Sequence, residues 1–238
     1  MEEITRLADA HLLWPIWSDS EKFEGEVPEI PEKGEYAWVL ITNNHPKSID
    51  NQLDELLTKL GSNIPKDVGG SCTITINEEK GPVYIHNKAI IDPSSFFEGP
   101  CYIGPNATIR HGAYVRPYSW ICSGAVVGHA SEIKRSLLLP NAKAPHFNYV
   151  GDSVLGSNVN LGAGCKISNL RLDGKEVNVR MGEYKMSSGV RKFGALLGDS
   201  VEIGCNVVTN PGVIMGCGSS VSPNITVTGI YPNNTKLR

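Results

Sequence analysis

The sequence predicts a mainly β protein, a parallel β-helix built from six-residue repeats and preceded by a small α/β N-terminal domain. Between residues 85 and 139 an apolar residue recurs at every sixth position, and a second series of mostly small residues lies two positions before it. With 40% of the chain hydrophobic, ten apolar residues in one phase would arise by chance roughly once in ten thousand trials. The large members of the repeat are Ile85, Ile91, Phe97, Ile103, Ile109, Val115, Ile121, Val127, Ile133 and Leu139.

A six-residue unit is too short to close a hairpin, so each unit forms one side of a coil. Three units of six complete a coil of 18 residues, and residues 18 apart then stack about 4.8 Å apart, the ordinary strand spacing. Stacked coils bury a continuous core that a single repeat could not bury. We therefore expect the β-helix to occupy residues 81–238.

The composition excludes several functional classes. Lys and Arg number 22 against 25 Asp and Glu, a net charge of -3, so we expect neither nucleic acid nor an anionic membrane as a partner. The N-terminus has no long apolar run, so we expect neither a signal peptide nor a membrane span, and a cytoplasmic location. No cysteines form a closely spaced metal-type pair, which favours reduced, structural thiols. The cysteines are Cys72, Cys101, Cys122, Cys165, Cys205 and Cys217.

Residues 1–80 lack the six-residue period and are predicted to form the α/β domain. Residues 36–42 (YAWVLIT) are a strand candidate, and residues 72–77 (CTITIN) alternate like a strand. Ser48 is a candidate N-cap for a helix that ends at Gly61. The domain either covers the open first coil or makes contacts of its own. The apolar face of the helix comprises Ile49, Leu53, Leu56, Leu57 and Leu60.

Two interruptions of the period predict loops outside the stack. After residues 140–149 the period resumes at Leu155 with a shift of four positions, so this segment is predicted to bulge from the coil. Residues 168–194 are rich in charge and glycine, and the period returns at Leu197. The second segment is either a loop or a distorted coil, and we expect a loop. Loops on a regular scaffold are favoured places for function.

The repeat also places charges on one corner. Arg116 and Lys134 both follow an inward residue and lie one coil apart, so their cations repel each other unless an anion lies between them. A phosphate suits such a pair, because Arg offers a planar fork and Lys a point charge. The alternative is two solvated side chains that point apart.

His111 and His129 are likewise one coil apart. They could form half of a zinc site shared with a neighbouring subunit, as in a metal-dependent hydratase. Because the closely spaced histidine pair of such enzymes is missing, we expect a surface stack and no metal.

Two motifs resemble a known family. Residues 146–152 (HFNYVGD) and 156–164 (GSNVNLGAG) are similar to the acetyltransferase domain of the bifunctional N-acetylglucosamine-1-phosphate uridylyltransferase/glucosamine-1-phosphate N-acetyltransferase. The similarity covers about residues 85–229 and preserves the spacing from Arg116 to Lys134 and on to His146. The resemblance implies a left-handed coil, acetyl-CoA as co-substrate and a homotrimer with sites between subunits.

The resemblance also implies roles for individual residues. A histidine with a pKa near 7 is matched to removing the proton of an amino sugar, whereas Cys165 lies inward and would have to reach the cleft as a thiolate. Direct transfer is therefore expected, with backbone N–H groups near Asn169 polarising the thioester carbonyl. The implied substrate-binding residues are Arg116, Glu132, Lys134, Tyr149 and Asn160, the catalytic residues are His146 and Asn169, and the cofactor-binding residues are Ala163 and Cys205.

The chain departs from the family pattern in three places. No glycine-rich nucleotide-binding sequence, and no domain of uridylyltransferase size, fits before Gly81, so nucleotidyl transfer is not expected. The segment after Asn169 is longer, with residues 173–175 (DGK) displaced, and Pro145 precedes the histidine. The sequence thus predicts a CoA-dependent N-acetyltransferase acting on an amino-sugar phosphate or a nucleotide-linked amino sugar. The alternative is a non-catalytic module that binds a sugar phosphate or a nucleotide sugar.

Overall fold

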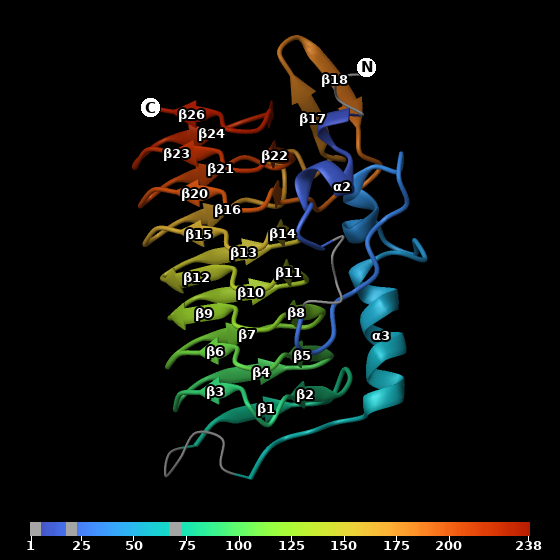
Figure 1. Cartoon of the computed structure of the whole chain (residues 1–238), viewed down its shortest axis with the longest axis vertical. Helices are drawn as coiled ribbons and strands as arrows, with labels where there is room; N and C mark the ends of the chain where they lie inside the picture. The colour runs from blue at the N-terminus through green and yellow to red at the C-terminus, as the bar shows by residue number, and fades with distance from the viewer. Residues whose placement is uncertain (1–5, 18–22, 67–72) are drawn as a thin grey trace.

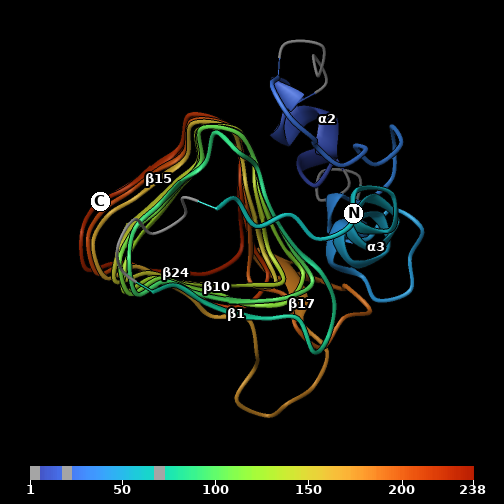
Figure 2. The same ribbon diagram turned by 90° about the horizontal axis from the view of Figure 1, so that it is seen from below.

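The computed structural model describes residues 6–17, 23–66 and 73–238, and it shows a parallel β-helix with N-terminal helices along one side (Figure 1). In this part of the chain, three parallel sheets of eight strands form the sides of the prism. The chain visits sheet 1, sheet 2 and sheet 3 in turn, and the coil is left-handed (Figures 1 and 2). The fold predicted from the period and the resemblance is confirmed.

The strands are short and lie between tight corners. Sheet 1 contains β2 (Val83–Ile85), β5 (Cys101–Ile103), β8 (Ser119–Ile121), β11 (Leu137–Leu138), β14 (Val154–Leu155), β19 (Ala195–Leu197), β22 (Val213–Met215) and β25 (Ile230–Tyr231). Sheet 2 contains β3 (Ile90–Ile91), β6 (Thr108–Ile109), β9 (Val126–His129), β12 (Lys143–His146), β15 (Asn160–Leu161), β20 (Glu202–Ile203), β23 (Ser220–Val221) and β26 (Lys236–Leu237). Sheet 3 contains β1 (Thr75–Asn77), β4 (Phe96–Glu98), β7 (Tyr114–Val115), β10 (Glu132–Lys134), β13 (Tyr149–Gly151), β16 (Lys166–Ile167), β21 (Val208–Thr209) and β24 (Thr226–Val227).

Residues 140–149 do not bulge from the stack, so the prediction of a loop there is wrong. This segment contains β12, which pairs with β9 and β15 as a regular part of sheet 2. The inward residues instead advance by five positions, from Ile133 to Leu138 and from Val150 to Leu155. Two such steps make the chain two residues shorter than a strict six-residue repeat. In a period of six, the loss of two residues and the insertion of four residues give the same phase. The period alone does not distinguish the two cases.

The shortened steps tighten the corner between sheets 3 and 1. Arg135 and Asp152 stand at these corners with φ angles of 45° and 47°, a left-handed conformation that is uncommon for residues other than glycine. The same shortening moves Leu138 into the coil core, whereas Leu139 is buried on the outside against the N-terminal segment. Leu139 was predicted to point inward, and this is also corrected.

The described N-terminal residues form helices joined by turns and irregular segments. Helix α2 spans Ala10–Leu13, and residues Ala37–Ile41 form the 3₁₀ helix η2 instead of the predicted strand. A short run that is apolar throughout fits a buried helix as well as a strand, which explains this error. Helix α3 (Ile49–Leu60) has the predicted Ser48 cap and ends at Gly61. The strand expected within residues 72–77 is β1, which belongs to the coil, and Cys72 lies outside the described residues.

The N-terminal helices cover the outer face of sheet 1 (Figure 2). Trp14 anchors them, because its indole N–H donates to the carbonyl of Leu197 at 2.8 Å and its ring is fully buried. The outer faces of sheets 2 and 3 point away from these helices. The outward side chains of sheet 1 that pack in this layer are Tyr102, Trp120, Leu137, Val154, Leu196, Ile214 and Ile230.

Between β16 and β19 the chain leaves the stack. It forms an antiparallel hairpin of β17 (Asn178–Met181) and β18 (Tyr184–Ser187). The hairpin returns through a closed neck, because Leu170 and Lys192 form an antiparallel bridge and the N–H of Phe193 donates to the carbonyl of Asn169 at 2.9 Å. The coil then continues directly, since β14 pairs with β19.

Candidate functional site

The outer face of sheet 3 gathers four of the sequence-predicted site residues. Glu132 and Tyr149 are Cα partners on neighbouring strands, and so are Lys134 and Gly151. Because β7 pairs with β10 in register, Arg116 lies one coil below Lys134, as predicted. Arg116, Glu132, Lys134 and Tyr149 therefore occupy one patch.

Each cation of the patch has a carboxylate partner. An Nη1–Oε1 distance of 2.7 Å joins Arg116 to Glu132, and 3.0 Å separates Nζ of Lys134 from Oδ2 of Asp152. The Nε of Arg116 is buried and has no hydrogen-bond partner among the residues that the structure describes. An anion that binds here must compete with Glu132 and Asp152.

Asp152 is the centre of the polar contacts at the sheet 3–sheet 1 corner. Its side chain is 1% exposed, and its carboxylate accepts hydrogen bonds from Lys134, Arg135 and Asn169. Arg135 also makes a bidentate contact to Asp50 of α3, with nitrogen–oxygen distances of 2.8 to 3.0 Å. The corner is thereby tied to the N-terminal helix, and the Asn169 amide is held beside Lys134.

Gly151 leaves the space in which two site side chains meet. A Cβ atom at this position would lie 2.6 Å from Nδ2 of Asn169 and 2.7 Å from Oη of Tyr149. Burial raises the pKa of Tyr149, and Asp152 raises it further, so the phenol stays protonated at neutral pH. The Tyr149 hydroxyl and the Asn169 amide lie side by side over Gly151 and present one polar surface.

Lys192 joins the site, and the sequence analysis missed it. The closed neck brings it beside Lys134, and the neighbouring ammonium, helped by burial, lowers the pKa of Lys192. The sequence contains one indication that the chain returns to the same point of the stack, because Ile167 and Leu197 are separated by a multiple of six residues. A chain that re-enters the stack where it left must bring its last residues back beside Asn169.

A cavity of about 310 Å³ opens between the N-terminal segment and the neck. Its charged lining has four cations and one carboxylate, so it is suited to an anion. The lining residues are Asn43, Lys134, Arg135, Asp152, Val190, Arg191 and Lys192.

The corner between sheets 2 and 3 aligns the predicted base with the predicted cofactor positions. The carbonyl of His146 accepts the N–H of Gly164 at 2.9 Å, and the carbonyl of Ala163 accepts the N–H of Asn206 at 2.8 Å. His146, Ala163 and Cys205 therefore stand on three successive coils, and the imidazole and Cys205 are exposed.

His146 is held by its neighbour Asn148, which is 2% exposed. The Asn148 side chain accepts the backbone N–H of His146 at 2.9 Å and donates to the carbonyl of Gly162 at 2.8 Å. Pro145, just before the histidine, lies over Gly128, where a Cβ atom would approach the Pro145 carbonyl oxygen to 1.6 Å. Gly128 thus allows the close approach of the Pro145 backbone just before His146.

Two other histidines continue this corner below His146. The rings of His111 and His129 stack with centroids 4.1 Å apart, and Phe147 meets His129 edge-on at 5.0 Å. Within residues 6–17, 23–66 and 73–238 there is no group of three His, Cys, Asp or Glu side chains that could hold a metal ion.

Two predicted residues are not brought into the patch. Asn160 lies on the outer face of sheet 2, where its amide donates to Glu202 at 3.2 Å, away from the residues on sheet 3. Cys165 is fully buried, and burial raises the pKa of its thiol to about 11. This thiol is therefore poorly suited to be a nucleophile at neutral pH.

Comparison with known proteins identifies the family. Residues 97–215, half of the chain, match the family model described as the GMPPB C-terminal domain. The Escherichia coli protein described as uncharacterized acetyltransferase YaiX is 31% identical over 180 residues, which cover 68% of this chain and 77% of that protein. The chain belongs to the family of the GMPPB C-terminal domain, within the hexapeptide-repeat acetyltransferases related to GlmU. The resemblance noted in the sequence is thereby confirmed.

Longer relatives match the same region. A bifunctional sugar-1-phosphate nucleotidylyltransferase/acetyltransferase from Sulfurisphaera tokodaii is 42% identical over 148 residues, 62% of this chain and 37% of that protein. The bifunctional protein GlmU of Methanococcus aeolicus is 38% identical over 170 residues, 71% of this chain and 41% of that protein. The chain thus spans about two fifths of the length of these relatives.

Among solved structures, the acetyltransferase domain of PglB from Neisseria gonorrhoeae in complex with acetyl coenzyme A has a TM-score of 0.29 and 14% identity. The match covers 91% of this chain and 79% of that one. None of the helices in the described part of the chain is long and apolar enough to cross a membrane.

Gly151→Ala is expected to disturb the site and leave the fold intact. The added methyl group would meet the ends of the Asn169 and Tyr149 side chains, which can move away, and not the backbone. We expect affinity for glucosamine 1-phosphate to fall at least tenfold in calorimetric titrations, with a circular dichroism spectrum like that of the wild type. Wild-type affinity in this variant would show that neither side chain contacts the ligand.

Lys192→Gln is expected to raise the melting temperature of the ligand-free protein at pH 7 and to weaken anion binding about tenfold or more. A lysine whose folded pKa is lowered destabilises the fold below that pKa, and the penalty is relieved as the pH rises through it. The stability gain should therefore shrink between pH 7 and pH 10. Lys185→Gln, at an exposed position of β18, is the matched control. A gain that grows with pH would contradict the repulsion between Lys192 and Lys134.

Proposed function

We propose that this protein is a CoA-dependent N-acetyltransferase that acetylates an amino-sugar phosphate or a nucleotide-linked amino sugar. The observation that carries the proposal is the corner column of His146, Ala163 and Cys205, which adjoins the cationic patch of sheet 3. Family membership supports the reaction class, and the patch supports a phosphorylated acceptor.

Acetyl-CoA is the proposed co-substrate, bound along the corner at Ala163 and Cys205. His146 removes a proton from the ammonium group of the sugar, and the free amine attacks the thioester carbonyl carbon. The new C–N bond forms and the C–S bond breaks, and the second proton that the nitrogen loses passes to the departing CoA thiolate. Backbone N–H groups near Asn169 stabilise the oxyanion that forms during the attack.

The acceptor phosphate is proposed to bind at Arg116 and Lys134, with Lys192 as a third cation. A phosphate beside Lys134 and Lys192 would replace their mutual repulsion by two attractions. The Tyr149 hydroxyl and the Asn169 amide, which lie side by side over Gly151, offer polar groups to the sugar hydroxyls. Glu132 keeps the Arg116 guanidinium in place until the acceptor binds.

His146→Ala is expected to lower turnover roughly 100-fold to 10,000-fold, the contribution of a positioned general base. The assay follows release of the CoA thiol with saturating acetyl-CoA and a panel of amino-sugar phosphates and nucleotide-linked amino sugars. Cys165→Ala should stay within a few-fold of the wild type, because its thiol is buried and protonated. His111→Ala, two coils below on the same corner, is the matched control.

Two outcomes of this assay, and one of thermal melting with each ligand, would reject the proposal. Normal turnover of His146→Ala together with an inactive Cys165→Ala would contradict direct transfer with His146 as the base and would favour Cys165 as a nucleophile. No acetyl transfer to any sugar of the panel would reject the reaction. A melting temperature that rises with sugar phosphates but not with acetyl-CoA would point to a non-catalytic binding module.

We also infer that the protein is a homotrimer whose site is completed by a neighbouring subunit. The N-terminal helices occupy sheet 1, which leaves the outer faces of sheets 2 and 3 for contact between prisms. Such contact would carry Asn160 of one subunit toward the sheet 3 patch of the next. Light scattering should give three times the mass of the chain, and a fully active monomer at micromolar concentration would exclude this arrangement.

A further inference from the structure

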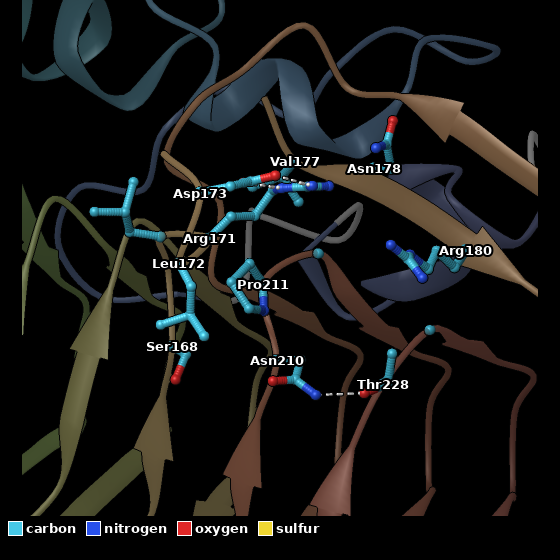
Figure 3. Close-up of a pocket in the computed structure, with 13 residues that line it drawn as sticks. Ser168, Arg171, Leu172, Asp173, Val177, Asn178, Arg180, Asn210, Pro211 and Thr228 are labelled. Atoms are coloured by element: carbon cyan, nitrogen blue, oxygen red, sulfur yellow. Dashed lines mark hydrogen bonds and ion pairs between the residues drawn. The ribbon is translucent and has the colours of Figure 1, made fainter. Parts of the chain in front are cut away.

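The hairpin segment, residues 168–194 between β16 and β19, forms one wall of a second cavity, which the proposed reaction does not use. This cavity, of about 550 Å³, lies between the segment and the upper coils at the sheet 3–sheet 1 corner (Figure 3). Ser168, Asn210 and Thr228, each at the end of a sheet 3 strand, line its inner wall, and Leu172 and Asn178 line its outer wall. Its volume lies in the range of small-molecule sites.

The lining combines apolar surface with amides and one unpaired cation. Leu172, Val177 and Pro211 supply apolar contact, and Leu172 is fully exposed. The Arg180 side chain has no hydrogen-bond or ion-pair partner among the described residues, although the backbone of Arg180 belongs to the β17–β18 ladder. By contrast, Arg171 is held by Asp173 through nitrogen–oxygen distances of 2.8 and 2.6 Å. In Figure 3 the Arg180 side chain lies apart from this pair, on the far side of Pro211.

This chemistry fits a nucleotide better than a sugar alone. A nucleobase has a flat apolar body for Leu172 and Pro211, and edges that pair with amide side chains such as Asn178. A phosphate or ribose group of the same ligand would meet Arg180. Since a hexose is more polar and would leave much of the cavity empty, apolar walls of this size favour the larger ligand.

The cavity lies on the acceptor side of the proposed reaction. Lys134, Gly151, Ser168 and Asn210 occupy equivalent places on successive coils, because β10, β13, β16 and β21 pair in order. Asn210 therefore lies about 14 Å above Lys134, three strand spacings. The proposed CoA positions stand at the opposite edge of sheet 3. A ligand can thus reach from the cationic patch into the cavity without crossing the CoA corner.

We propose that this cavity holds the nucleoside part of a nucleotide-linked amino sugar, with the diphosphate between it and the Lys134–Lys192 pair. The inference rests on the proposed function and selects, between its two substrate classes, the nucleotide-linked one. It gives the hairpin segment a role in choosing the acceptor. Arg180 and Asn178 then determine specificity without touching the reacting atoms.

Direct binding tests the subsite independently of activity. UDP, GDP and dTDP are titrated separately into the full chain by calorimetry, beside glucosamine 1-phosphate and adenosine 3′,5′-bisphosphate. We expect at least one nucleoside diphosphate to bind. Arg180→Ala should weaken that binding about tenfold and leave the affinity for glucosamine 1-phosphate unchanged. Lys185→Ala, an exposed lysine of the same hairpin outside the cavity, should change neither.

The outcomes separate the subsite from the reaction. If no nucleoside diphosphate binds, or if Arg180→Ala has no effect, the proposal is overturned. It is equally overturned if Arg180→Ala selectively weakens adenosine 3′,5′-bisphosphate, because the cavity would then belong to CoA. Nucleotide binding that depends on Arg180, in a protein that acetylates no sugar, would uphold the subsite while rejecting the acetyltransferase.

Discussion

A single buried carboxylate, that of Asp152, holds together the parts of the candidate site. Asp152 belongs to the coil, accepts Lys134 from the neighbouring coil and Asn169 from the start of the hairpin segment, and reaches α3 through Arg135. A buried carboxylate is stable only when its charge is paired and hydrogen-bonded, so these groups are constrained to meet around it. The corner at which they meet is the corner shortened by one residue.

The sequence predicted the fold well because the constraint behind it is periodic and local. Inward residues such as Phe97, Val115 and Ile133 need only a phase, and the structure pairs them in that register. What the period could not reveal is a change of coil length, since losing two residues and gaining four produce the same phase. The prediction of a strand around Trp38 was wrong for another reason. This run is apolar without alternation, so tertiary contacts decide its conformation, and one of these contacts, Phe193, lies far away in the chain.

The site was predictable where it follows the coil and unpredictable where it does not. Arg116, Lys134 and Tyr149 meet because each stands at a fixed offset from an inward residue. Lys192 follows a segment without any period, so only the closed neck shows that it lies beside Lys134. Asn160 also stands at a regular offset from an inward residue. It lies on the outer face of sheet 2, however, so within one chain it does not meet the site residues on sheet 3.

The closed neck of the hairpin segment separates the length of this insertion from the architecture that carries it. Because Asn169 and Phe193 are joined by a backbone hydrogen bond, the chain resumes its coil as though the intervening residues were absent. Related proteins could exchange this segment for shorter or longer ones while every core contact below it persists. The coil then serves as a constant scaffold, and related proteins can acquire different ligands by changing the inserted segment alone.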